Sequence, residues 1–148
     1  MVEDEWRVFR DVRLAALIEA PHAFSARFED ENQRTEAEWR AKVVGWARFV
    51  IELDGRVVGM VSGGPSNYPR AAVLTSLWVD PSARGMGIGD RLVQKVVDWS
   101  KDEGFGRLLL WVAEGNIHAE RLYERNGFAR TGDVIHQPKR EFEMSKQL

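Results

Sequence analysis

A glycine-rich hexapeptide, Arg84-Gly85-Met86-Gly87-Ile88-Gly89, constrains this chain more than any other segment. It lies between a strand-like run at residues 73–79 and an amphipathic helical pattern that continues to about Asp102. Three glycines in five residues let the backbone turn its own N–H groups around an anion, and a helix N-terminus favours negative charge. Arg84 adds a permanent positive charge at the entrance. The hexapeptide therefore predicts an anchor for a phosphorylated cofactor.

Two common glycine motifs do not fit this hexapeptide. Its spacing is G-x-G-x-G, whereas dinucleotide-binding folds use G-x-G-x-x-G in a first βαβ unit. A P-loop would end in Gly-Lys-Ser/Thr, but Gly89 is followed by Asp90 and Arg91. The spacing alone leaves a tight strand-to-helix turn without function as the alternative.

Hydrophobic periodicity divides the whole chain into helical and strand-like segments. Apolar residues at spacings of three and four predict helices at residues 4–19, 35–44, 88–102 and 116–125. Short apolar or alternating runs predict strands at residues 48–53, 56–62, 73–79, 107–113, 128–131 and 140–146. This order predicts one domain over residues 1–148 with a mixed α/β fold, in which helices flank a largely antiparallel sheet.

Turn and capping signals separate several of these segments. Asp54-Gly55 is a two-residue hairpin signal, and Gly63-Gly64-Pro65 predicts a loop after the second strand. Thr35 and Glu38 have the spacing of a capping box, and Gly104 is expected to end the helix that follows the hexapeptide.

Composition excludes several classes of site. The chain has no cysteine, so disulfides, thiolate metal sites and a cysteine nucleophile are impossible. The three histidines have no metal-ligand spacing, and we expect no metal. A net charge of −2 gives no reason to expect binding to nucleic acid or a membrane surface. The acidic start has no secretory pattern and residues 108–113 are too short to span a bilayer, so we expect a cytoplasmic protein.

Two motifs resemble the GNAT superfamily of acetyl-CoA-dependent N-acetyltransferases. Its R/Q-x-x-G-x-G/A signature matches at Arg84, Gly87 and Gly89. Its N-x-x-A-x-x-L-Y-x-x-x-G-F pattern matches at Asn116, Ala119, Leu122, Tyr123, Gly127 and Phe128. The resemblance covers nearly the whole chain in element order. Since relatives begin with a strand and only residues 1–4 precede the first helix here, a short or missing first strand is expected.

The resemblance implies a GNAT-like acyl-CoA N-acyltransferase fold with acetyl-CoA as co-substrate. In this family the strands at residues 73–79 and 107–113 splay apart, so backbone groups of Leu77, Trp78 and Val79 pair with pantetheine. The pyrophosphate is then expected beside Arg84, on the N–H groups of Gly85, Met86, Gly87, Ile88 and Gly89. The resemblance also places Asn116 against the pantetheine arm, whereas the sequence alone makes it a helix N-cap.

The resemblance makes Tyr123 the general acid that gives its proton to the departing thiolate of CoA. The alternative is a tyrosine packed on the helix beside Leu122. No general base can be assigned, because relatives read Leu-Glu-Val where this chain reads Leu110-Trp111-Val112. That departure argues against the branch that acetylates protein N-termini. The remaining candidates, each also explained as a solvated surface group, are Glu29, Glu31, Glu114 and His136.

We therefore expect an enzyme that transfers acetyl directly from acetyl-CoA to a primary amine of a small molecule. Acetylation of a protein lysine or N-terminus is one alternative, and a non-catalytic CoA-binding sensor is the other. Trp78 and Trp111, beside the expected cleft, suit the wall of an acceptor pocket, although core packing suits each as well. Because dimers are common in the superfamily, a homodimer is one option.

Overall fold

The computed structural model describes residues 1–24, 26–136 and 139–148. Within these ranges the α-helices are α1 (Trp6–Glu19), α2 (Phe28–Glu31), α3 (Glu36–Val43), α4 (Ile88–Asp102) and α5 (Ile117–Arg125). The strands are β1 (Ala47–Leu53), β2 (Arg56–Pro65), β3 (Ala71–Val79), β4 (Arg107–Ala113), β5 (Ala129–Ile135) and β6 (Glu141–Gln147). Short 3-10 turns are η1 (Glu3–Glu5), η2 (Pro21–Ala23) and η3 (Pro81–Ala83). No strand precedes α1 in the described part of the chain.

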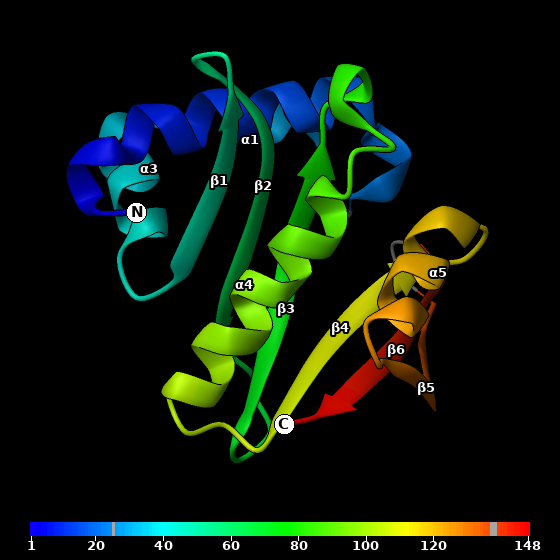
Figure 1. Cartoon of the computed structure of the whole chain (residues 1–148). Helices are drawn as coiled ribbons and strands as arrows, with labels where there is room; N and C mark the ends of the chain where they lie inside the picture. The colour runs from blue at the N-terminus through cyan, green and yellow to red at the C-terminus, as the bar shows by residue number, and fades with distance from the viewer. Residues whose placement is uncertain (25, 137–138) are drawn as a thin grey trace.

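All six strands form one sheet in the order β1-β2-β3-β4-β6-β5 (Figure 1). Every neighbouring pair is antiparallel except β3 and β4, which are parallel. The predicted mixed α/β class with a largely antiparallel sheet is therefore confirmed. The predicted hairpin is confirmed too, since Leu53 pairs with Arg56 and both turn residues, Asp54 and Gly55, have positive φ.

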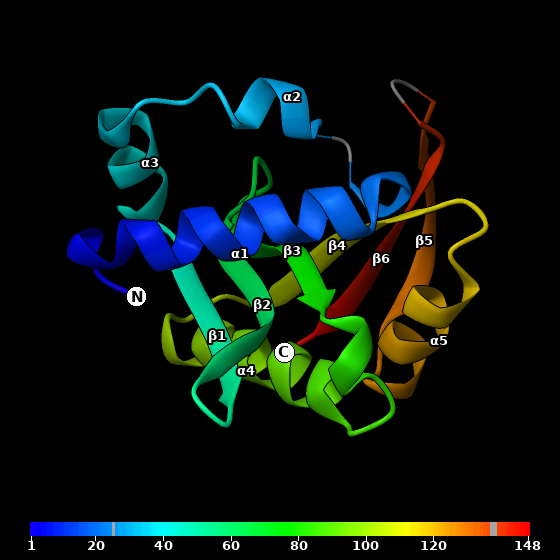
Figure 2. The ribbon, with the colours of Figure 1, turned by 90° about the horizontal axis from the view of Figure 1, so that it is seen from above.

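Helices cover both faces of the sheet. Figure 2 shows α1 lying across one face, with α2 and α3 on the same side and α4 on the other. The α4 side holds the larger core, which includes Leu92 and Val96 against Val61 of β2 and Leu110 of β4. On the α1 side, apolar side chains of α1 pack on Met60 and Trp78. Because successive side chains of a strand point to opposite faces of the sheet, the strands contribute apolar side chains to both cores.

The parallel pair β3–β4 separates along its length. Pairing joins residues 71–73 to residues 107–109, and no further β3–β4 pair follows (Figure 1). From Leu74 to Val79 the β3 edge that faces β4 therefore has no strand partner among the described residues. Such an edge offers backbone N–H and C=O groups to another extended chain.

A bulge interrupts β3 within this separated half. Met60 pairs with Trp78, and Ser62 pairs with Thr75, so β3 has one residue more than β2 over this stretch. Ser76 takes up the extra length with φ 58°, a left-handed conformation that is unusual for a residue other than glycine. No local sequence pattern predicted this bulge.

The prediction of a loop at Gly63-Gly64-Pro65 is wrong, because all three residues belong to β2. A Cβ on Gly63 would lie 3.0 Å from the Trp99 ring and from Val96. These glycines therefore leave room for aromatic rings that pack on β2. The strand continues through them. The strands β3 and β5 are also longer than predicted, beginning at Ala71 and ending at Ile135, respectively.

Candidate functional site

The turn into α4 exposes backbone donors. Gly85 and Gly87 have φ of 81° and 75°, and a Cβ on either would meet nothing within 4 Å. Conformation, and not lack of space, therefore favours glycine at both positions. Gly87 is the N-cap of α4, and the first main-chain bond that closes on it comes from Arg91 N–H, at 3.2 Å. The N–H groups at the start of α4 thus precede the helical hydrogen bonds and suit an anion.

The other residues of this turn have different roles. Gly89 lies in the first turn of α4, where a Cβ would be 3.1 Å from Leu122 Cδ2, so close packing against α5 also favours glycine there. Ile88 is buried in the core, whereas Met86 is 61% exposed at the tip. Packing of Ile88 therefore fixes the turn, while its outer side stays open to solvent.

Arg84 fastens the turn to two other elements. Its Nη2 donates to Glu19 Oε2 at 2.7 Å, and its Nε donates to the Val79 carbonyl at 3.1 Å. Glu19 also accepts from Trp78 Nε1 at 2.8 Å. Arg84 is therefore ion-paired at the C-terminal end of α1, and its charge is partly balanced before any ligand arrives.

Asp90 brings a negative charge into the first turn of α4. Its carboxylate accepts from Arg125 Nε and Nη2, both at 3.1 Å, and from Asn126 Nδ2 at 2.9 Å. The Arg125 hydrogen bond holds the pKa of Asp90 below its usual range. Asp90 therefore links α4 to the end of α5. Because Arg125 offsets the charge of this carboxylate, Asp90 repels an anion at the turn only weakly.

The open edge of β3 presents alternate backbone groups. Asp80 N–H donates to the Val58 carbonyl at 2.7 Å, and Gly59 pairs with Val79. Antiparallel alternation then directs the backbone N–H and C=O of Val79 away from β2, and those of Trp78 toward β2. Since Arg84 occupies the Val79 carbonyl, the N–H is the backbone group of Val79 that has no partner among the described residues.

Two of the residues in the second motif have clear structural roles. Asn116 Oδ1 accepts from Ala119 N–H at 3.3 Å, which confirms Asn116 as the N-cap of α5. Tyr123 is 7% exposed, and its ring meets Phe128 edge-to-face at 6.0 Å. Burial raises the pKa of Tyr123 well above the ordinary value, so the phenol is protonated at neutral pH. Among the described residues, its hydroxyl has no hydrogen-bond partner.

The four base candidates from the sequence are not brought together. Glu29 lies 3.7 Å from Arg27 and Glu114 lies 3.7 Å from Arg140, and both carboxylates are exposed, as is His136. Glu31 is buried, and both its oxygens accept from Arg13, at 3.1 and 3.3 Å. Glu31 lies near β3, because its partner Arg13 also donates to Ser76.

Sequence reasoning missed one buried carboxylate. Glu143 on β6 is 3% exposed and pairs in register with Trp111 of β4. Its Oε1 accepts from Thr131 Oγ1 at 2.8 Å, while Oε2 is buried without a partner in the described residues. The alternating segment Glu141-Phe142-Glu143 could not have identified it, since the sequence does not say which acid faces inward.

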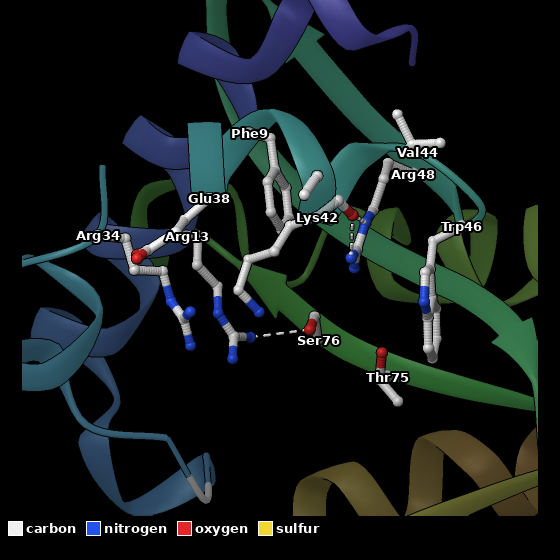
Figure 3. A pocket seen from close by; sticks show the side chains of 11 residues that line it. Phe9, Arg13, Arg34, Glu38, Lys42, Val44, Trp46, Arg48, Thr75 and Ser76 are labelled. Carbon is white, nitrogen blue, oxygen red and sulfur yellow. Dashed lines mark hydrogen bonds between the residues drawn. The ribbon is translucent and has the colours of Figure 1, made fainter. Parts of the chain in front are cut away.

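Sequence reasoning also missed a cavity of about 620 Å³ on the α1 face of the sheet (Figure 3). Trp78 does not line it, because that indole is buried against α1. Its core-packing alternative is thereby confirmed, and Trp111 is likewise absent from the lining. The cavity is lined by Phe9, Arg13, Arg34, Glu38, Ala41, Lys42, Val44, Trp46, Arg48, Thr75 and Ser76.

No group of three His, Asp or Glu side chains in residues 1–24, 26–136 and 139–148 is placed to hold a metal ion. Over the same ranges, each helix is too short or too polar to traverse a bilayer.

Comparison with known sequences gives a consistent family. Residues 11–128 match the sequence model of the acetyltransferase (GNAT) family. An uncharacterised N-acetyltransferase of Methanocaldococcus jannaschii is 36% identical over 85 residues, which are 54% of this chain and 38% of that protein. The mycothiol acetyltransferase of Thermomonospora curvata is 38% identical over 90 residues, which are 60% of this chain and 30% of that protein. The chain thus spans well under half the length of these relatives.

Comparison with solved structures gives the same fold. The ribosomal-protein-alanine N-acetyltransferase of Brucella melitensis superimposes with a TM-score of 0.74 and 24% identity, covering 100% of this chain and 97% of its own. An acetyltransferase candidate from Salmonella typhimurium, solved with its cofactor acetyl-CoA, superimposes with a TM-score of 0.76 and 22% identity. That match covers 100% of this chain and 91% of the other.

Proposed function

This chain belongs to the GNAT acetyltransferase family, and from that premise we propose that it transfers the acetyl group of acetyl-CoA directly to a primary amine, preferably of a small molecule. One observation carries the proposal. The strand-free edge of β3 leads through Arg84 into the glycine turn and the N-terminus of α4. The pantetheine arm of CoA is extended, contains amides and ends in a pyrophosphate, so it matches backbone N–H donors arranged in that order.

The donor would lie along this continuous surface. The Val79 N–H, which points to the open edge, would pair with a pantetheine amide, as would Leu77, which has the same alternation phase. The pyrophosphate would accept from N–H groups between Gly85 and Gly89. Arg84 would act mainly by holding the turn against Glu19, and Asn116 would face the pantetheine arm across the separation of β3 and β4.

The chemistry asks two things of the chain. A backbone N–H on the β3 edge would polarise the thioester carbonyl while the neutral amine attacks it, and the proton lost by the amine would pass to solvent water. Tyr123 would then face the sulfur as its negative charge develops. Because a thiol has a pKa near 8.5 and burial raises the pKa of Tyr123, the phenol is the weaker acid. Tyr123 would therefore stabilise the leaving thiolate chiefly by donating a hydrogen bond as the charge develops.

A small-molecule acceptor is favoured over a protein by the shape of the α1 face. A cavity of about 620 Å³ falls within the usual range for small-molecule sites. Acetylation of a protein lysine or N-terminus is the second candidate, favoured by the fold shared with the Brucella melitensis protein. A CoA-binding sensor without catalysis is the third.

Release of free CoA, measured with a panel of small amines and of peptides bearing lysine or a free N-terminus, tests the proposal. Acetyl-CoA binding is measured in parallel by calorimetry. We expect saturable binding and turnover with at least one small amine. Tight binding without turnover on any amine would favour the sensor, and turnover on peptides alone would favour a protein substrate. Absence of acetyl-CoA binding would overturn the function altogether.

A further inference from the structure

Four of the eleven residues that line the cavity on the α1 face carry positive side chains. Arg13 comes from α1, Arg34 precedes α3, Lys42 lies on α3 and Arg48 lies on β1 (Figure 3). These residues are far apart in the sequence, and the packing of α1 and α3 over β1 and β3 brings them to one wall. We call this group of four the cationic wall.

The positive charge of this wall is not neutralised within the described residues. Arg34, Lys42 and Arg48 have no carboxylate within 4.0 Å there, whereas Arg13 is paired with Glu31. Glu38 also lines the cavity, but its Oε2 accepts from the Thr35 N–H at 3.2 Å as part of the α3 capping box. Two carboxylates thus stand against four cations. The cavity therefore has an excess of positive charge.

Arg48 is the least exposed member of the wall, at 8%. Its Nε and Nη2 donate to the Lys42 carbonyl at 3.1 and 2.6 Å, and its Nη1 donates to Ser62 Oγ at 2.7 Å. Its guanidinium lies 4.4 Å from the Phe9 ring centroid. Burial, reinforced by Arg13, lowers the pKa of Arg48 to about 10, so this group is still charged at neutral pH. The buried Arg48 cation is therefore held by neutral hydrogen-bond partners, whereas an acidic partner is expected for a buried charge.

Arg34 and Lys42 are two further cations without an acidic partner among the described residues. The Nε of Arg34 is buried and has no hydrogen-bond partner in the described part of the chain. Burial lowers the pKa of Lys42, and the nearby charge of Arg34 lowers it further. An anion in the cavity would supply the missing acceptor for Arg34 and relieve the repulsion between these cations.

The cationic wall adjoins the proposed donor site. Arg13 Nη1 donates to Ser76 Oγ at 2.8 Å, and Thr75 and Ser76 line the cavity. Ser76 forms the β3 bulge and immediately precedes Leu77 on the edge proposed to hold pantetheine. A ligand in the cavity would therefore approach β3 from the α1 face, close to the strand segment where the thioester is expected.

Resting on the proposed function, we propose that the cationic wall binds a compact oxyanion group, a carboxylate or a phosphate, carried by the acceptor amine. Guanidinium groups match both oxyanions through paired N–H···O bonds. The acceptor would thus be a small amino acid-like or amino-phosphate compound, its anion at Arg34 and Lys42 and its amine directed toward Ser76. The anion sets specificity and takes no part in the acyl transfer.

Three matched amines test this inference: 4-aminobutyrate, its neutral amide, and 3-aminopropyl phosphate. Each is measured for CoA release and, separately, for binding by calorimetry. At least one anionic amine should bind about tenfold tighter than the neutral amide, as expected when a charge-assisted pair is gained. The relative strength of the carboxylate and the phosphate identifies the preferred oxyanion. Equal binding of the neutral amide, or no binding of either anionic amine, would overturn the inference.

Variants K42M and R34Q, both partly exposed and outside the proposed acetyl-transfer machinery, test the wall itself. Each should raise KM for the anionic amine about tenfold and leave kcat and the neutral amide unchanged. K95Q removes an exposed positive charge from α4 on the opposite face and should change neither constant. If K42M and R34Q leave KM unchanged, the wall does not bind the acceptor. Charge-dependent binding by calorimetry without any turnover would retain the anion site and overturn only the proposed enzyme activity.

Discussion

Gly64 of β2 lies directly under the indole of Trp46, so that a Cβ on Gly64 would fall 2.6 Å or less from three carbons of that ring. Trp46 in turn lines the cavity on the α1 face and lies 5.2 Å from the Arg48 guanidinium, measured to the ring centroid. The glycine therefore allows an aromatic wall to stand beside the cationic wall.

Replacing Gly64 by alanine should lower the free energy of unfolding by about 1–3 kcal/mol, because the added methyl group must push the indole or the strand aside. Urea denaturation measures the change. Gly106→Ala is the matched control, since a Cβ there would meet only the Arg70 carbonyl at 3.9 Å. The control should stay within about 0.5 kcal/mol of the parent protein. Equal losses for the two variants would contradict the packing argument.

Replacing Gly87 by valine should weaken CoA binding about tenfold or more, because a β-branched residue resists the φ of 75° that directs the turn. Calorimetric titration with CoA measures this directly. Gly132→Val is the control, since Gly132 also has a positive φ of 98° and open space but lies on β5. An unchanged Kd in the Gly87 variant would show that the turn does not hold the pyrophosphate.

Replacing Tyr123 by phenylalanine should lower kcat about 100-fold, the low end for the loss of one hydrogen-bond donor to a developing negative charge, while the Kd for acetyl-CoA stays the same. The ring contact with Phe128 does not need the hydroxyl, so the variant should fold normally. Single-turnover kinetics together with calorimetry separate the two effects. Tyr68→Phe, at an exposed position, is the control. A normal rate in Tyr123→Phe would leave only the packed-tyrosine alternative.

The Asp90–Arg125 pair should make stability depend on pH in the acid range. The folded-state pKa of Asp90 is lowered, so its contribution is present above the unfolded value near 3.9 and is lost as pH falls through the folded value. Asp90→Asn should therefore cost about 1 kcal/mol or less at pH 7, because the pair is partly exposed.

Thermal unfolding at pH 7 and at pH 3 measures this difference between the Asp90 variant and the parent. The gap in Tm should narrow in acid. Asp133→Asn, at an exposed position on β5, should show no comparable gap at pH 7. A gap of the same size at both pH values would mean that the carboxylate charge contributes nothing.

Local patterns predicted much of this fold. The Thr35–Glu38 capping box opens α3, and Asp54-Gly55 forms the β1–β2 turn, because each depends on backbone geometry within a few residues. The same local logic failed at Gly63 and Gly64. A glycine pair looks like a loop unless it is known that Trp99 and Trp46, distant in sequence, pack on the strand.

By itself, the sequence determined the glycine turn, the helix behind it and the motif on α5, since positive φ and helical periodicity are written in neighbouring residues. Only the tertiary structure decided that Arg84 is tied to Glu19, that Ser76 bulges out of β3, and that four cations share one cavity. The physical reason is that charge balance, burial and free hydrogen-bonding groups depend on which distant segments pack together. The proposed donor surface thus follows from local pattern, whereas the proposed acceptor surface follows only from the fold.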